Sequence, residues 1–205
     1  MPQSASLLKR IMRFLSFTLL ICVLLVFAPN LRAQSPTEQM QDTMDRIIAV
    51  LRTIRSPEDV EKNREALHRL LIVRFDFTAM AKRSLGNRWS DLDGKEGAFV
   101  AVFTDYVEHA YMSTLGSYRG EKVVYDRDQV EGELAEVDTR VIGGEGAPIK
   151  IQYKLNLTDG EWLVYDAVID EVSVVENYRS QFARVLRTAS LEDLIQSLRA
   201  KASQR

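Results

Sequence analysis

The sequence predicts an α+β fold, and two changes in its apolar pattern support this prediction. Apolar side chains recur three and four positions apart between residues 44 and 118, which is typical of amphipathic helices. They alternate with polar side chains between residues 121 and 170, which is typical of half-buried strands. Helical spacing returns after residue 174. We therefore expect helices, then a four-stranded antiparallel or mixed sheet covered on one face, then two closing helices.

The first 33 residues have the pattern of a secretory signal peptide. Three basic side chains within the first 13 positions precede an uncharged run, FLSFTLLICVLLVFA, at 14–28. A membrane-spanning helix needs about 20 apolar residues, so this shorter run favours an export signal. Cleavage after Ala33 would leave a single domain over 34–205. An uncleaved membrane anchor is the alternative.

Composition narrows the function classes of the exported chain. Cys22 is the only cysteine, so residues 34–205 contain no disulfide and no thiolate metal site or nucleophile. All four charged residues among the first 33 are basic, and their removal leaves 23 basic against 29 acidic side chains, a net charge of −6. Such a chain should not bind nucleic acid or adhere stably to anionic lipid surfaces. It is long enough to build its own core.

The first half of the domain is expected to hold three shorter helices. The first covers about 44–56. Ser56 is a predicted cap for the second helix, with Pro57 at the first helical position. A short third helix should begin near Asp76 and stop at Gly86, because glycine commonly ends helices.

A long helix is predicted from residue 95 to residue 118, and it carries an aromatic-rich stripe. Aromatic and aliphatic side chains occupy its three-four spacing. Such a stripe either fills a solid core or lines a cavity, since ligand pockets are mostly apolar and aromatic. Periodicity alone does not separate the two.

The strands follow, joined by turns rich in glycine. Asp159-Gly160 is a two-residue hairpin signal between the third and fourth strands. The fourth strand, from Trp162 to about Asp170, is expected to place a single set of side chains on one face, namely Leu163, Tyr165, Ala167 and Ile169. The closing helices are predicted over 174–188 and 191–202.

Candidate catalytic groups are few. His68 and His109 lie in different predicted helices without cysteine or H-E-x-x-H spacing, so no metal site is expected. Asp166 and Asp170 are expected on one face of the fourth strand, where they can act as general acid and base of an isomerase or hydrolase, or can lie on the solvated face of the sheet.

Three segments together resemble the MlaC family of periplasmic phospholipid-binding proteins, also described as toluene-tolerance auxiliary components of an ABC transporter. They are FDFTAMAKRSLGNRW at 75–89, EGAFVAVFTDYVEHAYMSTLGSY at 96–118 and VYDAVIDEVSVVENYRSQF at 164–182. One departure is Glu171, where members usually have glycine. The resemblance implies a curved sheet of the nuclear-transport-factor type, with helices enclosing an apolar lipid cavity.

The resemblance also implies a function and partners. It suggests a non-catalytic, monomeric carrier without cofactor or metal, which takes phospholipid between an outer-membrane lipoprotein-porin complex and an inner-membrane ABC transporter with an MCE subunit. A hopanoid-associated carrier of the same fold is the alternative. Arg179 would meet a head group at the mouth, or else pair with Glu176 or Glu171 on the surface. The cavity would be lined by Phe99, Val102, Phe103, Tyr106, Val107, Tyr111, Ile151, Tyr153, Leu155, Leu163, Tyr165, Ala167, Ile169, Val172, Tyr178 and Phe182.

Overall fold

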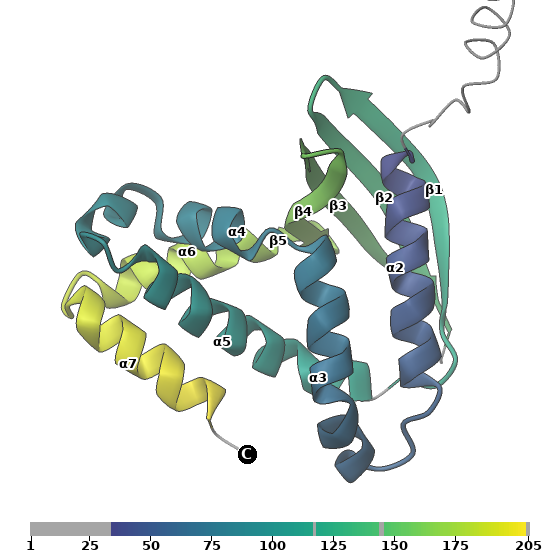
Figure 1. Ribbon diagram of the computed structural model, residues 1–205, viewed down its shortest axis with the longest axis horizontal. Helices are drawn as coiled ribbons and strands as arrows, with labels where there is room; N and C mark the ends of the chain where they lie inside the picture. Colours follow the sequence, from purple (N-terminus) through teal and green to yellow (C-terminus); the bar gives the residue numbers. More distant parts are fainter. Residues whose placement is uncertain (1–33, 117, 144–145, 204–205) are drawn as a thin grey trace, which may run out of the picture. The chain divides into compact units, whose positions relative to one another are not determined.

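A computed structural model describes residues 34–203 of the protein, apart from residues 117, 144 and 145 and the side chains at 57 and 112–116 (Figure 1). The predicted signal peptide lies outside the described residues. Among the described residues, no helix combines the length and the apolar character that crossing a bilayer requires.

The first two helices begin at capping boxes. Helix α2 (Pro36–Leu51) starts earlier than expected, because the Ser35 side chain accepts from the Glu38 N–H at 3.1 Å while the Glu38 carboxylate accepts from the Ser35 N–H at 2.7 Å. The residues directly after Ser35 are mostly polar, so the spacing of apolar residues does not predict that the helix begins there. Helix α3 (Pro57–Arg74) begins as predicted, with Ser56 as its cap.

The other helices form one cluster in which α4 packs along α6 and α5 along α7 (Figure 1). Asp76 caps α4, since its Oδ1 accepts from the Ala79 N–H at 2.8 Å, and Gly86 ends that helix at a φ of +60°, as predicted. The bounds are α4 (Phe77–Leu85), the 3₁₀-helix η1 (Gly86–Leu92), α5 (Glu96–Gly116), α6 (Val174–Val185) and α7 (Leu191–Ala202).

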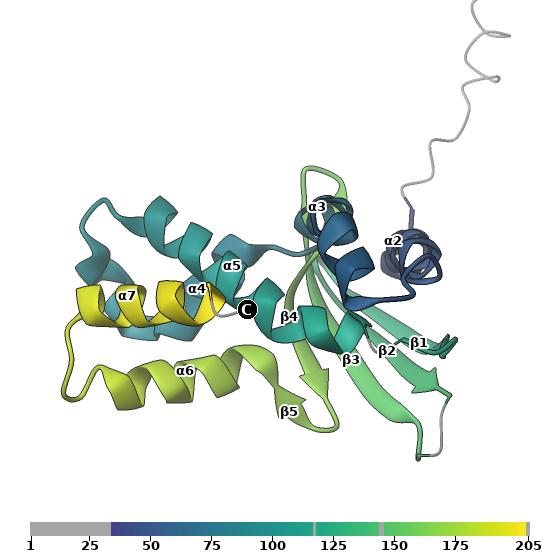
Figure 2. The ribbon, with the colours of Figure 1, turned by 90° about the horizontal axis from the view of Figure 1, so that it is seen from below.

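The sheet is an antiparallel meander of five strands in chain order, which confirms the α+β prediction with one strand more than expected (Figure 2). The added strand, β5, pairs with the end of β4 and leads directly into α6. Two residues are too few for a period-two pattern to show. The strands are β1 (Lys122–Glu131), β2 (Leu134–Ile142), β3 (Ile149–Thr158), β4 (Glu161–Ile169) and β5 (Val172–Ser173).

A β-bulge in β4 changes which side chains face the core. Leu155 of β3 lies opposite Val164, yet the preceding residue, Lys154, lies opposite Asp166. Tyr165 is therefore the extra residue, and the alternation along β4 is inverted around it. Leu155 and Val164 are both fully buried.

The prediction that Leu163 and Tyr165 share a face with Ala167 and Ile169 is thus wrong. Before the bulge the inward residues are even-numbered, and after it they are odd-numbered, so Ala167 and Ile169 alone point inward as expected. Tyr165 instead lies under the guanidinium of Arg83, 4.2 Å from its ring centre.

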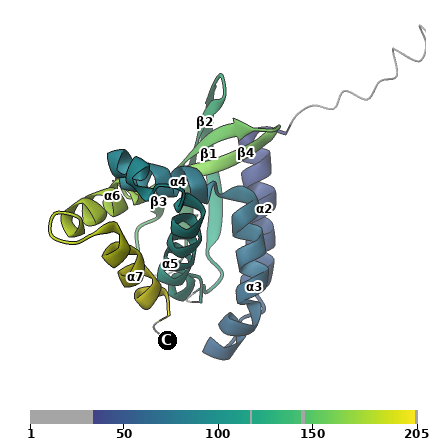
Figure 3. The same ribbon diagram turned by 60° about the vertical axis from the view of Figure 1, so that its left-hand side comes forward.

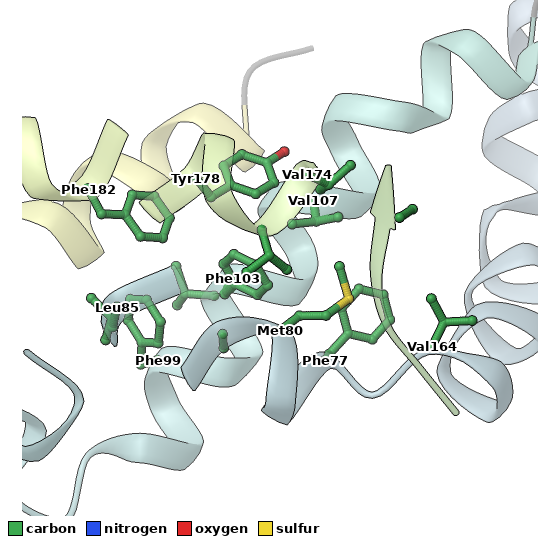
Figure 4. Close-up of a cluster of buried hydrophobic side chains, with 14 of the residues drawn as sticks. Phe77, Met80, Leu85, Phe99, Phe103, Val107, Val164, Val174, Tyr178 and Phe182 are labelled. Carbon is green, nitrogen blue, oxygen red and sulfur yellow. The ribbon is translucent and has the colours of Figure 1, made fainter. Parts of the chain in front are cut away.

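The main core joins the sheet to the helical cluster. Its largest fully buried side chains include Phe99 and Phe103 of α5, and Figure 4 shows them between residues of α4 and α6. A second, smaller core of Ile47, Leu51 and Leu67 holds α2 to α3, which lie side by side (Figure 3).

Arg74 attaches α2 and α3 to the sheet through a buried polar network. Its Nη1 donates to the Gln39 side-chain oxygen at 2.6 Å and to the Trp162 carbonyl at 2.5 Å, while Nε donates to the Thr43 hydroxyl at 3.1 Å. Burial lowers the pKa of Arg74, and the nearby Glu161 carboxylate opposes that shift. The pattern of apolar residues in the sequence does not predict such a polar network.

Candidate functional site

The candidate site is one end of the inner face of the sheet, the face that carries Val137 and Leu155. Helices cover the middle of this face, where Val137, Leu155 and Val164 are fully buried. Toward the β2–β3 connection the cover is incomplete, and the exposed fraction reaches 44% at Ile149 and 58% at Val172. We call this region the open end; it consists of Val123, Tyr125, Val141, Ile149, Ile151, Ile169 and Val172.

The open end is a continuous apolar surface because its residues lie opposite one another on adjacent strands. Tyr125 lies opposite Thr139, and Thr139 lies opposite Ile151. On the next strands, Ile151 lies opposite Ile169, and Ile169 lies opposite Val172. Apart from the Thr139 hydroxyl, which donates to the Ile151 carbonyl at 3.0 Å, this row presents only apolar groups and a phenol. Such a surface suits an apolar ligand.

Two tyrosines on the inner face are removed from water to different degrees: Tyr153 is buried, whereas Tyr125 is half-buried and has a shielded hydroxyl. Burial raises the pKa of the Tyr153 phenol to about 12. Burial also raises the pKa of Tyr125, and the neighbouring Tyr153 and Asp45 add to that shift. Both phenols therefore stay neutral hydrogen-bonding groups at physiological pH.

Several aromatic rings of the α5 stripe contact aromatic rings of α6. The rings of Phe103 and Tyr178 are 5.6 Å apart, and the Phe99 and Phe182 rings are 6.2 Å apart (Figure 4). Tyr106 also meets Tyr178 at 5.6 Å. The structure brings the predicted residues of the two helices together, but as rings in contact with each other.

The remaining α5 residues of the predicted set divide between other surroundings. Val107 is buried in the main core. Tyr111 is 36% exposed, and burial of its ring still raises the pKa of its phenol, with Tyr106 contributing. Val102 borders a cleft of about 370 Å³ whose walls are mostly charged, and this cleft is lined by Arg64, Glu65, His68, Val102, Asp105, Glu108, Arg199, Ala202 and Ser203.

The cleft contains a contact that sequence reasoning missed. His68 Nδ1 lies 2.7 Å and 2.9 Å from the two carboxylate oxygens of Glu108, which is only 8% exposed. Burial is the largest influence and raises the pKa of Glu108, while His68 acts in the opposite direction. The pair joins α3 to α5. Among the described residues, no cluster of three metal-ligating side chains is present.

Arg179 lies on α6, where it takes part in an ion pair. Its Nη1 lies 3.2 Å from Glu176, so the surface ion pair considered as the alternative is the one observed. The guanidinium also lies over Gly86, where a Cβ atom would approach Arg179 Nε to 3.2 Å. The head-group contact of Arg179 stays a prediction.

The two aspartates are not a paired site. The Asp166 carboxylate accepts from the Ser173 hydroxyl at 2.7 Å and the Val175 N–H at 3.0 Å. Asp170 lies beyond β4 in the turn to β5, where its Oδ1 accepts from the Lys150 N–H at 3.0 Å. Each carboxylate is engaged with its own backbone segment.

These observations define a class: α+β proteins with an open antiparallel sheet whose inner face is covered by helices except at one apolar end. The chain belongs to the MlaC family, because the family model described as MlaC protein matches residues 41–200.

Relatives and a solved structure agree with this assignment. The chain is 25% identical over 199 residues to the intermembrane phospholipid transport system binding protein MlaC of Haemophilus influenzae, covering 92% of this chain and 93% of that protein. It is 25% identical over 174 residues to the toluene tolerance protein ttg2D of Pseudomonas putida, covering 82% and 81% of the two chains.

A phospholipid-binding protein from Ralstonia solanacearum, solved in complex with a phospholipid, has the same fold. It superposes with a TM-score of 0.74 at 20% identity and covers 83% of this chain and 98% of its own.

Proposed function

We propose that this protein is a periplasmic carrier that buries the acyl chains of one glycerophospholipid and moves it between the outer and inner membranes. The observation that carries the proposal is the open end, a continuous apolar surface left half-covered in a member of the MlaC family. Its similarity to an intermembrane phospholipid transport system binding protein, and to the fold of a protein solved in complex with a phospholipid, supports it.

The free energy needed to extract a lipid from a bilayer determines how much of its acyl chains the carrier must bury. Each methylene removed from water contributes about 0.8 kcal/mol, so two acyl chains of about 30 methylenes represent on the order of 24 kcal/mol. A carrier that leaves half of this surface wet would not extract lipid from a bilayer. The helices around the open end must therefore move apart so that the acyl chains fit between them and the sheet. The cleft beside Val102 is unsuited to acyl chains because its walls are mostly charged.

The carrier would act without catalysis and without a cofactor, as a monomer. The partners with which it exchanges lipid would be an outer-membrane lipoprotein-porin complex and an inner-membrane ABC transporter with an MCE subunit. The engagement of Asp166 and Asp170 with backbone N–H groups favours a carrier over a hydrolase or isomerase.

Native mass spectrometry of the exported protein tests the proposal. After denaturation, the released small molecule is identified by its mass and fragmentation. One diacyl phospholipid per chain is the expected result. A hopanoid would assign the alternative cargo. Protein that carries no lipid, and that also takes none from phospholipid vesicles, would refute the carrier function.

A further inference from the structure

Two interior tyrosines have hydroxyl groups without a partner. The Oη atoms of Tyr118 and Tyr125 are both shielded from solvent, and neither makes a hydrogen bond in the described structure. Unpaired buried hydroxyls are unfavourable and uncommon in native proteins, so each one needs an explanation such as a ligand or an ordered water.

Only Tyr125 belongs to the open end. Tyr118 packs against the separate core formed by Ile47, Leu51 and Leu67 of α2 and α3. Tyr125 packs against the main core and lies opposite Thr139, in the same row as Ile151.

The backbone around Tyr125 holds its ring toward the interior. A β-bulge follows at once, since Tyr125 pairs with Thr139 while Arg127 pairs with Asp138, and Asp126 is the extra residue. Asp126 accepts two hydrogen bonds of 2.6 Å from Arg140, which fix this part of β1 to β2. Bulges of this kind direct a neighbouring side chain.

Tyr125 lies between the covered and the exposed parts of the inner face, a position that suits the ester groups of a phospholipid. On one side of it lies the covered surface of Val137 and Tyr153, which suits acyl chains, and on the other lies the row of Ile149, which is 44% exposed. A glycerophospholipid bound with its tails inward places its ester groups between tails and head group. Ester carbonyls accept hydrogen bonds and donate none, and the Tyr125 hydroxyl is a donor without an acceptor.

We propose that the Tyr125 hydroxyl donates a hydrogen bond to an ester carbonyl of the bound phospholipid, so that the protein distinguishes ester-linked from ether-linked lipids. This inference rests on the proposed carrier function and adds a residue that selects the linkage chemistry of the cargo. A neutral hydrogen bond of this kind changes a binding equilibrium roughly twofold to tenfold.

The test is a competition between two lipids that differ only in linkage. The protein is incubated with vesicles containing equal amounts of diacyl phosphatidylethanolamine and its dialkyl ether analogue of the same chain length, reisolated, and its bound lipids are measured by mass spectrometry. Wild-type protein should favour the ester roughly twofold to tenfold, and Tyr125→Phe should bring the ratio close to one. Tyr165→Phe is the matched control, because that ring lies outside the site beneath Arg83, and it should keep the wild-type ratio.

Each outcome is decisive. A wild-type ratio of one, or a preference that survives Tyr125→Phe, overturns the inference while leaving the carrier function intact. Recovery of neither lipid from wild-type protein overturns the carrier function and the inference with it. Thermal unfolding of the empty proteins gives a second readout: Tyr125→Phe should be at least as stable as wild type, since the lost hydroxyl has no internal partner, and a clear loss of stability would show that the hydroxyl has a structural role.

Discussion

The Asp166 carboxylate accepts a hydrogen bond of 3.0 Å from the backbone N–H of Val175, so the fourth strand holds the first turn of α6. Asp166 also accepts from the Ser173 hydroxyl, which itself caps α6 by accepting from the Glu176 N–H at 3.0 Å. A carboxylate at a helix N-terminus is favoured by the helix dipole. This pairing explains why an acidic side chain is buried beside an apolar interior.

Replacing Asp166 with alanine should therefore destabilise the fold. The Val175 N–H would lose its buried partner, which costs about 1–3 kcal/mol in the free energy of unfolding. Chemical denaturation followed by circular dichroism measures the change. Glu136→Ala is the matched control, since Glu136 lies in the same row of the sheet, and its effect should be within about 0.5 kcal/mol. An Asp166→Ala variant as stable as the control would contradict the structural role.

The prediction of the fold succeeded where the apolar pattern repeats over many residues. The caps at Ser56 and Asp76 and the stop at Gly86 were predictable, since their chemistry is local. The bulge at Tyr165 was not, because it depends on the register between β4 and β3, and one extra residue moved Leu163 and Tyr165 to the other face.

The candidate site was predictable only in part, for a similar reason. Periodicity identified Ile151 and Ile169 as inward residues, and the pairing across the sheet bears this out. It gave no information about which inward positions the helices cover, because coverage depends on the placement of whole elements. Tyr125 lies within the stretch 121–170 that the alternation predicts to form strands, yet its unpaired hydroxyl is visible only once its surroundings are known.

Ile151→Asn should reduce phospholipid loading. Ile151 is half-buried at the open end, and a polar amide against an acyl chain costs about 1–3 kcal/mol, which lowers the affinity for lipid roughly fivefold to a hundredfold. Lipid bound per protein, measured after incubation with vesicles, reports the effect. Val168→Asn is the control on the opposite face of the sheet and should load normally. Equal loading of both variants would argue against the open end as the lipid surface.

Glu171→Gly should stabilise the protein. Asp170 and Glu171 form the turn between β4 and β5 with φ values of +45° and +70°, in the left-handed region that disfavours side chains. Relief of roughly 1–2 kcal/mol is partly offset by the greater freedom of glycine in the unfolded chain, which leaves a gain of about 0.5–1 kcal/mol. Glu171→Ala keeps the Cβ atom and should show no such gain in denaturant unfolding. If alanine stabilises as much as glycine, the side chain and not the backbone is responsible.

The buried Glu108 should give the stability of the protein a specific pH dependence. Its pKa is raised above the ordinary value of 4.5, chiefly by burial, so the folded state binds its proton more tightly than the unfolded chain does. The resulting contribution to stability is complete below the unfolded pKa and is lost as the pH rises through the folded pKa.

Glu108→Gln, which remains neutral, should therefore gain stability relative to wild type as the pH rises from about 5 to about 7.5. Urea denaturation of both proteins at the two pH values measures this difference. Glu65→Gln, an exposed position on α3, should show a constant difference from wild type. If Glu108→Gln loses relative stability with rising pH, then its ionised carboxylate is favoured by His68 more than it is disfavoured by burial, and the pair acts as an attractive link between α3 and α5.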